Sequence, residues 1–251
     1  MTEHASKLLS GIELFSELND NQKYWVKKVI DSLHAKSTIK IHNTSVLSEG
    51  VFHGLGDAFK IHHSFSIEPF SKDKFEYVLE KVCILNGYKA ILAPKGNRGH
   101  DITIESIKYS LKTQADKNIR KNKLWISKFM ELGKGVWSDK PGDLTGLRNS
   151  FFKHMKNYDR ILSLRAIQKA PEWKYELVEI PKKLLLKAKK GKLEMKLDSR
   201  QFPRPGYCYV TDDDKEIYQL YFDGGSERKL QVKNLLKEYC DVWATWSFTI
   251  H

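Results

Sequence analysis

The spacing of apolar residues along the chain predicts amphipathic helices separated by short strands. Helical spacing is clearest at residues 71–86, where one face carries Phe75, Val78, Leu79, Val82 and Cys83. Ser71 supplies an N-cap for this helix, and Gly87 supplies a stop signal. The same spacing predicts helices at 20–33, 123–132 and 143–156, and a short basic helix at 182–190. A glycine-punctuated stretch lies between Gly50 and Gly56.

Short apolar or alternating stretches predict β-strands between and after these helices. They cover residues 89–93, 160–168, 174–180, 207–211, 216–222 and 230–232. The part of the chain from about residue 192 therefore reads as mostly β. No internal repeat, low-complexity tract or linker interrupts the pattern. We expect one α/β domain over residues 1–251, built on a mixed sheet with flanking helices and a mostly β C-terminal extension at about 192–251.

The stretch GHDITIESIKYSLKTQ, Gly99–Gln114, predicts a β-hairpin. Apolar side chains alternate with polar ones in both halves, with Ser106 and Ile107 at the centre. Pairing about that centre places Asp101 opposite Lys112, and Glu105 opposite Lys108. A shift of the pairing by one residue would move Lys112 to the other face of the hairpin. The pattern therefore predicts a specific pairing register, which a structure can test.

Composition and charge narrow the class of protein. The 251 residues include 43 Lys and Arg against 31 Asp and Glu, which gives a net charge of +12. A folded protein of this charge is expected to bind a polyanion, most often nucleic acid. The three cysteines form no CxxC pair, and we expect a reduced, cytoplasmic protein without a zinc site. No apolar run is long enough for a membrane span, and no Walker-type loop implies ATP.

A carboxylate and an ammonium held at one end of a sheet suit the hydrolysis of phosphodiesters. Asp101 can bind Mg²⁺, which takes oxygen ligands and keeps several waters. Lys112 can orient or deprotonate the attacking water, or stabilise the charge of the transition state. The alternative is a cross-strand salt bridge between the same two side chains, with no catalytic role.

The surroundings of this hairpin resemble the core of the PD-(D/E)xK nuclease superfamily. A helix with Glu76 precedes a strand, a loop, "GHD" ending in Asp101, and "SLK" ending in Lys112. Further stretches along the chain resemble the SmaI-type type II restriction endonucleases. They are VFHGLGD, IHHSF, GHDITI, LKT, FMELGKG, LVEIP, PGYCYV and YFDGGSERKL. The resemblance implies a restriction-endonuclease-like fold with its catalytic core at about residues 71–180.

The resemblance also implies roles for individual residues. Asp101 would be the central Mg²⁺ ligand, with the backbone carbonyl of Leu111 as a second ligand. Lys112 would be the catalytic lysine, and Glu76 would bind a second ion or a metal-bound water. The site would therefore hold one or two Mg²⁺ ions.

The chain departs from the family pattern at the first position of the catalytic triplet. Ser110 stands where an acid is usual, and members of the superfamily with Ser or Thr there can take the acid from the following helix. Glu131 is the candidate for that acid, and Glu105 is a weaker one. Gln114 could touch the site through its amide or face solvent as a plain polar residue.

Several polar residues are candidates for contacting DNA. Arg pairs with guanine and Asn or Gln with adenine in the major groove, while backbone contacts come from many polar groups. In the loop before Asp101 the candidates are Asn97 and Arg98. Elsewhere they are Gln114, Arg148, Asn149, Arg200, Gln201 and Arg204. The alternative is that these residues cap helices, form turns or stay solvated.

The resemblance implies a type II restriction endonuclease that cuts double-stranded DNA with Mg²⁺ and leaves 5′-phosphates. The site would be a short, palindromic, G+C-rich sequence, and a cognate DNA methyltransferase would protect the host. One hairpin gives one active site, so cutting both strands of a palindrome asks for a homodimer. Two alternatives stay open from the sequence. One is a nicking or repair nuclease of the same fold, and the other is a non-catalytic DNA-binding protein.

Overall fold

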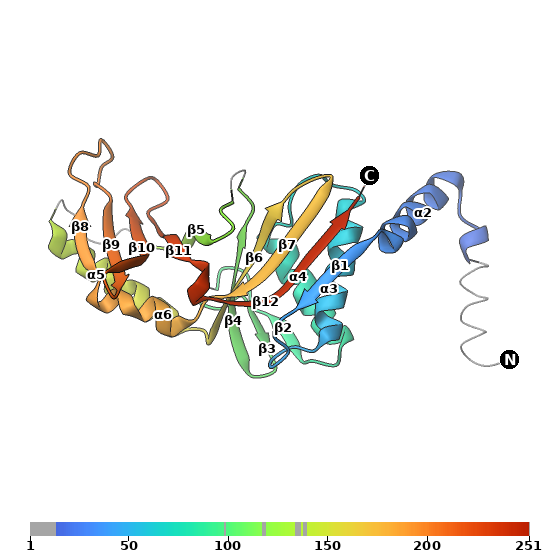
Figure 1. The fold of residues 1–251 in the computed structure, drawn as a ribbon, viewed down its shortest axis with the longest axis horizontal. Helices are drawn as coiled ribbons and strands as arrows, with labels where there is room; N and C mark the ends of the chain where they lie inside the picture. Colours follow the sequence, from blue (N-terminus) through green and yellow to red (C-terminus); the bar gives the residue numbers. More distant parts are fainter. Residues whose placement is uncertain (1–13, 98, 117–118, 134–136, 138–139, 251) are drawn as a thin grey trace.

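Two β-sheets lie one after the other along the long axis of the molecule (Figure 1). The computed structural model describes residues 14–250 except residues 98, 117–118, 134–136 and 138–139. The mixed α/β architecture with a largely β C-terminal part confirms the fold class expected from the sequence.

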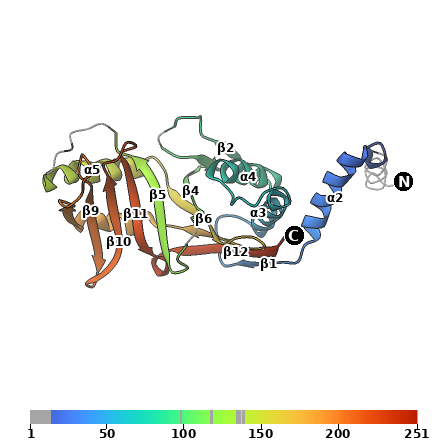
Figure 2. The same cartoon turned by 90° about the horizontal axis from the view of Figure 1, so that it is seen from above.

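The first sheet has seven strands and carries the hairpin. In spatial order its strands are β1 (Ser37–Ile41), β12 (Asp241–Thr249), β7 (Glu172–Glu179), β6 (Arg160–Gln168), β4 (Ile107–Gln114), β3 (Ile102–Ile104) and β2 (Ala90–Leu92). Among these described strands the β4–β6 pair is parallel, and the other five pairs are antiparallel. Helices α3 (Glu49–His63) and α4 (Lys72–Leu85) cover one face, and α2 (Asp20–His34) extends from the end of the molecule (Figure 2).

The second sheet is antiparallel throughout. Its strands run in the order β5 (Lys123–Glu131), β11 (Lys229–Leu236), β10 (Lys215–Asp223), β9 (Gly206–Asp212) and β8 (Lys192–Met195). Helix α5 (Pro141–Met155) packs on it, and α6 (Lys182–Leu186) leads into β8 through a 3₁₀ turn at Lys187–Lys190. A second 3₁₀ turn, Lys237–Tyr239, leads from β11 to β12. Each sheet has its own buried apolar cluster.

Helix α4 forms where the sequence predicts it. The Ser71 side chain accepts a hydrogen bond from the Lys74 backbone N–H at 3.4 Å, and Phe75, Leu79, Val82 and Cys83 are buried. The predicted helices at 20–33, 143–156 and 182–190 and the predicted strands at 160–168 and 174–180 are also confirmed within a few residues. So are the three strands predicted between residues 207 and 232.

The glycine-punctuated stretch after Gly50 is helical, and this helix was not predicted. Its glycines serve close packing instead of turns. A Cβ on Gly54 would lie 2.7 Å from Val82 Cγ1 of α4, and one on Gly56 would lie 2.9 Å from Trp246 Cδ1 of β12. Glycine has a low helix propensity, so the glycines in this stretch argued against a helix when only the sequence was considered.

The helix predicted at 123–132 is wrong, because this segment is strand β5. Leu124, Ile126 and Phe129 are buried, and their spacing of two and then three resembles a helical pattern. The pairing of β5 with β11 shifts register between Leu230 and Val232 and again between Val232 and Leu235. Such irregularities break the period of two that identifies a strand in sequence.

The hairpin is present, but its register differs from the prediction by two residues. Thr103 pairs with Lys108 and Ile104 with Ile107, so the turn consists of Glu105 and Ser106. Glu105 takes a left-handed conformation with φ 55°. Asp101 therefore lies opposite Ser110, and the predicted pairings Asp101–Lys112 and Glu105–Lys108 are wrong. Because the shift is even, Asp101 and Lys112 keep the same face.

The single domain with a catalytic core at 71–180 stays a prediction. The sheet that holds Asp101 also includes β1 and β12, which lie outside those residues. Within the described part of the chain, no helix is both long and apolar enough to cross a membrane.

Stability is expected to fall between pH 7 and pH 5 because of His63. Its ring stacks on Trp173 with ring centroids 3.5 Å apart, Nδ1 lies 2.9 Å from the Ser66 carbonyl oxygen, and Nε2 lies 2.8 Å from the Tyr175 hydroxyl. Burial lowers the pKa of His63 to about 4. The unfolded chain takes up this proton near pH 6.5, so stability is lost as the pH falls from 6.5 towards 4. Urea unfolding should show about 2 kcal/mol of this loss by pH 5.

The variant His63→Gln should unfold more easily at pH 7 but lose less stability on going to pH 5. The matched control is His53→Gln, which changes an exposed histidine of the same helix. Equal slopes of stability against pH for wild type and His63→Gln would contradict the assignment.

Candidate active site

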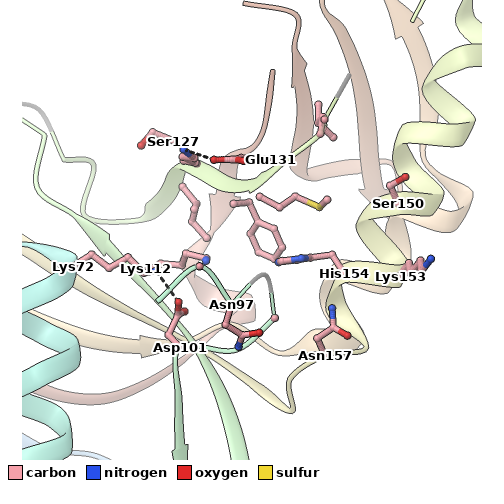
Figure 3. Close-up of a pocket in the computed structure, with 18 of the residues that line it drawn as sticks. Lys72, Asn97, Asp101, Lys112, Ser127, Glu131, Ser150, Lys153, His154 and Asn157 are labelled. Atoms are coloured by element: carbon pink, nitrogen blue, oxygen red, sulfur yellow. Dashed lines mark hydrogen bonds and ion pairs between the residues drawn. The ribbon is translucent and has the colours of Figure 1, made fainter. Parts of the chain in front are cut away.

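A cavity of about 770 Å³ opens between the two sheets. The first sheet and its helix α4 supply one side, with Lys72, Asp101 and Lys112, and the loop before Asp101 adds Asn97. Strand β5 and helix α5 supply the other side, with Phe129, Glu131 and His154 among others. Figure 3 shows Asp101, Lys112 and His154 directed towards this space from three different elements.

Asp101 lies immediately before β3 and is held there by backbone hydrogen bonds. Its backbone N–H donates to the Tyr109 carbonyl at 2.8 Å, and its carbonyl accepts from the Ala93 N–H at 2.9 Å. Its Oδ2 accepts from the Leu111 N–H at 2.6 Å and from the Ser110 hydroxyl at 3.3 Å. These donors fix the orientation of the carboxylate, and its other oxygen, Oδ1, accepts from Lys72 Nζ at 2.7 Å.

Lys112 is buried, with 8% of its surface exposed, and its Nζ lies 5.5 Å from the centre of the Phe129 ring. Burial lowers the pKa of Lys112 to about 8, although the nearby Asp101 charge acts to raise it. Among the described residues Lys112 forms no ion pair, and the partner of Asp101 is Lys72. The cross-strand salt bridge considered from the sequence is therefore absent.

Glu76 lies on α4 beside Asp101, as the sequence resemblance implied, and one lysine joins the two carboxylates. Lys72 Nζ is 3.0 Å from Glu76 Oε1 and 2.7 Å from Asp101 Oδ1. Burial lowers the pKa of Lys72, but the two carboxylates outweigh burial and the pKa is raised overall. The sequence analysis missed Lys72. Its spacing of four residues from Glu76 on a predicted helix was the available signal.

His154 is a second residue that the sequence analysis missed. It lies on α5, with its ring centroid 6.1 Å from that of Phe129 and 5.4 Å from that of Tyr158. Burial, and then the nearby Lys112 charge, lower the pKa of His154 to about 4, so the ring is neutral at pH 7. Its position three residues after Phe151 on the apolar side of a predicted helix was a signal for an inward-facing side chain.

The donors on the first sheet fit a magnesium ion better than a zinc ion. In the described ranges, no three or more His, Cys, Asp or Glu side chains are placed so that they could together hold a metal ion. Asp101 and Glu76 supply two carboxylates bridged by one ammonium. The Leu111 N–H points at Asp101, and in a strand the carbonyl of the same residue points to the same side. One or two carboxylates, a carbonyl and waters form a set that Mg²⁺ accepts.

Comparison with known proteins decides the family. A family model described as "SmaI: Type II site-specific deoxyribonuclease" matches residues 15–248. The chain is also 42% identical over 241 residues to the type II restriction enzyme SmaI of Serratia marcescens, covering 94% of this chain and 95% of that protein. This chain belongs to the SmaI family of type II site-specific deoxyribonucleases. No solved structure matches it significantly.

The SmaI-family assignment confirms the resemblance found in the sequence and makes the chain a nuclease that acts on DNA. It sets aside a non-catalytic DNA-binding protein. The membership of this SmaI-family enzyme in the PD-(D/E)xK superfamily and the roles of its individual residues stay predictions.

Two of the predicted acids lie away from the two carboxylates that Lys72 joins. Glu131 lies on strand β5 instead of a helix, exposed at the edge of the cavity, and pairs with Lys128 at 3.0 Å. Glu105 lies in the hairpin turn, where its Oε1 accepts from the Lys89 N–H at 2.8 Å. Ser110 is buried beside Asp101 and donates to it.

The residues predicted to contact DNA fall into two groups in this SmaI-family enzyme. Asn97 lines the cavity, Asn149 and Arg200 are exposed, and Arg98 lies outside the described residues. The other residues contact the protein itself. Gln114 is buried and accepts from Arg165 Nε at 2.9 Å, so it does not face solvent. Arg148 donates to the carbonyls of Ala188 and Gly191, both at 3.1 Å.

Two predicted residues lie in the turn that precedes β9. Gln201 donates to Asp223 Oδ1 at 2.8 Å, and the Arg204 carbonyl accepts from Trp137 Nε1 at 3.0 Å. Gln201 and Arg148 are thus engaged in packing the second sheet, which favours the structural alternative for both.

Proposed function

We propose that the chain cuts both strands of DNA at a short, palindromic, G+C-rich sequence, with Mg²⁺ and with the cavity between the sheets as its active site. Family membership supports the reaction class. The observation that carries the choice of site is the convergence of Asp101, Glu76 and Lys112 on one end of the first sheet.

Asp101, Glu76 and the Leu111 carbonyl would hold one or two Mg²⁺ ions. A bound Mg²⁺ would neutralise the charge of the phosphate and lower the pKa of a coordinated water. Ser110 and the Leu111 N–H keep the Asp101 carboxylate oriented for this role. Glu131, on the opposite side of the cavity, remains the candidate for a further acidic group if DNA brings it closer.

The Lys112 ammonium would contact the scissile phosphate from the protein interior. Its ammonium can donate hydrogen bonds to the charge that develops on phosphorus-bound oxygens, and it can orient the attacking water. The water oxygen bonds to phosphorus and gives up a proton, while the bond from phosphorus to O3′ breaks and O3′ leaves as a hydroxyl after taking up a proton from solvent. The phosphate therefore stays on the 5′ end of the downstream fragment. The burial of Lys112 gives its charge a low-dielectric setting in which such a contact is strong.

The charge of the cavity lining supports a polyanionic substrate. Among the residues that the structure describes, four lysines line it, namely Lys72, Lys112, Lys128 and Lys153. Asp101 and Glu131 are the acidic residues of this described lining. Asn97 and Asn157 add neutral polar groups at the entrance, which suits contacts to sugar and phosphate.

The chain would act as a homodimer inside the bacterial cell, paired with a DNA methyltransferase of the same specificity. The two strands of a palindromic DNA site are related by two-fold symmetry. A two-fold homodimer can therefore place one active site on each strand. Methylation of the shared site would protect the host DNA from this chain.

Cleavage is expected to need a divalent cation and to produce a discrete set of fragments. The experiment incubates the protein with plasmid and genomic DNA in Mg²⁺ or in EDTA, and then sequences the ends. Fragments with one shared, two-fold symmetric end sequence and a 5′-phosphate, formed only with Mg²⁺, would support the proposal.

Other outcomes discriminate between the remaining possibilities. Nicks without paired cuts would favour the nicking or repair nuclease. Equal cleavage in EDTA would overturn the role of the metal. The variant Asp101→Asn, which keeps the shape of the side chain, should cut no DNA under either condition.

A further inference from the structure

Lys72 takes a position that a metal-binding site would reserve for a cation. Its Nζ contacts Asp101 Oδ1 at 2.7 Å and Glu76 Oε1 at 3.0 Å. The two carboxylates belong to different elements, the hairpin and α4, and share this ammonium. Asp101 has its other oxygen turned to the Leu111 N–H and the Ser110 hydroxyl. The oxygen left for a cation is thus the one that Lys72 contacts.

The lysine reaches this position from a helix that holds it in place. Lys72 lies in the first turn of α4, one turn before Glu76, so both side chains lie on the same side of the helix. The Lys72 side chain is 40% exposed, whereas those of Glu76 and Asp101 are 20% and 17% exposed. The lysine thus approaches from the solvent side and can leave without disturbing the packed core.

We propose that Lys72 is the resident counter-cation of the active site and competes with the divalent metal for Asp101 and Glu76. This inference rests on the proposed role of these two carboxylates in holding Mg²⁺. In the free protein Lys72 offsets one of the two negative charges and lies between the carboxylates, which would otherwise repel each other in a half-buried setting. When the metal binds, the ammonium moves to the open side of the cavity, where a DNA phosphate can accept its hydrogen bonds.

The competition makes a directional prediction about metal affinity. Lys72→Met removes the ammonium but keeps most of the side-chain volume, so we expect divalent metal to bind about tenfold more tightly than in wild type. Lys72→Arg keeps the competing charge and should bind metal no more tightly than wild type. The control is Lys27→Met, because Lys27 also pairs with an acid four residues later, Asp31, on an exposed helix far from the cavity.

The experiment is isothermal titration of the full-length protein with Mn²⁺ and with Mg²⁺, without DNA, so that cleavage plays no part in the readout. Each variant is also melted in EDTA. Lys72→Met should have a lower melting temperature than wild type in EDTA, and added metal should raise that temperature further than it does for wild type. Lys27→Met should match wild type in metal affinity.

The outcomes separate this inference from the proposed metal site. If Asp101→Asn abolishes metal binding while Lys72→Met binds no more tightly than wild type, the site stands and the competition is overturned. If Asp101→Asn binds metal as wild type does, the proposed site itself fails, and the inference fails with it. Tighter binding by Lys72→Met alone, with Lys72→Arg unchanged or weaker, supports the competition.

Discussion

Replacing Lys112 with methionine is expected to lower the rate of DNA cleavage about 10³-fold, while the protein folds at least as stably as wild type. The ammonium is buried and without an ion-pair partner in the described structure, so its loss removes a desolvation cost. Methionine fills nearly the same volume beside Phe129. Single-turnover cleavage of a labelled duplex and urea unfolding would measure the two effects.

The matched control is Lys40→Met, which changes an exposed lysine on the edge strand of the same sheet. It should cut DNA at the wild-type rate. A Lys112→Met protein with wild-type cleavage would remove Lys112 from the reaction. Loss of stability together with activity would instead mark Lys112 as a packing residue.

Replacing Arg165 with methionine is expected to destabilise the protein by about 3–5 kcal/mol. Arg165 is fully buried on β6, forms an ion pair with Glu176, and donates to Gln114 on β4. Its Nη2 also donates to the carbonyls of Arg120 and Lys123, both at 2.7 Å, next to the start of β5. The substitution leaves Glu176 buried with Lys237 as its one charged partner among the described residues. Urea unfolding at pH 7 would measure the loss.

The double variant Arg165→Met, Glu176→Leu separates charge from packing. Removing both ends of a buried ion pair is far less costly than removing one, so it should recover much of the lost stability. A double variant as unstable as the single one would show that the hydrogen bonds to β5 matter more than the charge. Arg160→Met is the control, because its partner Glu179 also accepts from Trp243 Nε1 and its own side chain is partly exposed.

The sequence predicted the face of the hairpin correctly, although it placed the turn wrongly. The alternation of apolar and polar residues determines which side chains share a face of the sheet. It therefore predicted correctly that Asp101 and Lys112 lie on the same side. It does not determine where the chain reverses. The left-handed conformation of Glu105 allows a two-residue turn that the residue types alone did not indicate.

The residues on the far side of the cavity could not be predicted from the sequence, because they belong to the second sheet and the helix packed on it. His154 and Phe129 approach Lys112 only when α5 and β5 pack against the hairpin, and nothing local in the sequence encodes that approach. The irregular pairing of β5 hid even its identity as a strand. For Gln114 and Arg148 the error is of another kind. Their residue types suggested contacts to DNA, but both side chains form hydrogen bonds within the protein.

The order of the strands determines when the first sheet can form during synthesis of the chain. The chain passes between the two sheets from β4 to β5, from β5 to β6, from β7 to β8 and from β11 to β12. The last of these strands, β12, lies between β1 and β7 in the sheet that holds Asp101. A nascent chain therefore cannot close that sheet until residues up to Thr249 have left the ribosome. We expect the capacity to cut DNA to arise only after β12 has emerged, and neither sheet to be separable as an independently folding half.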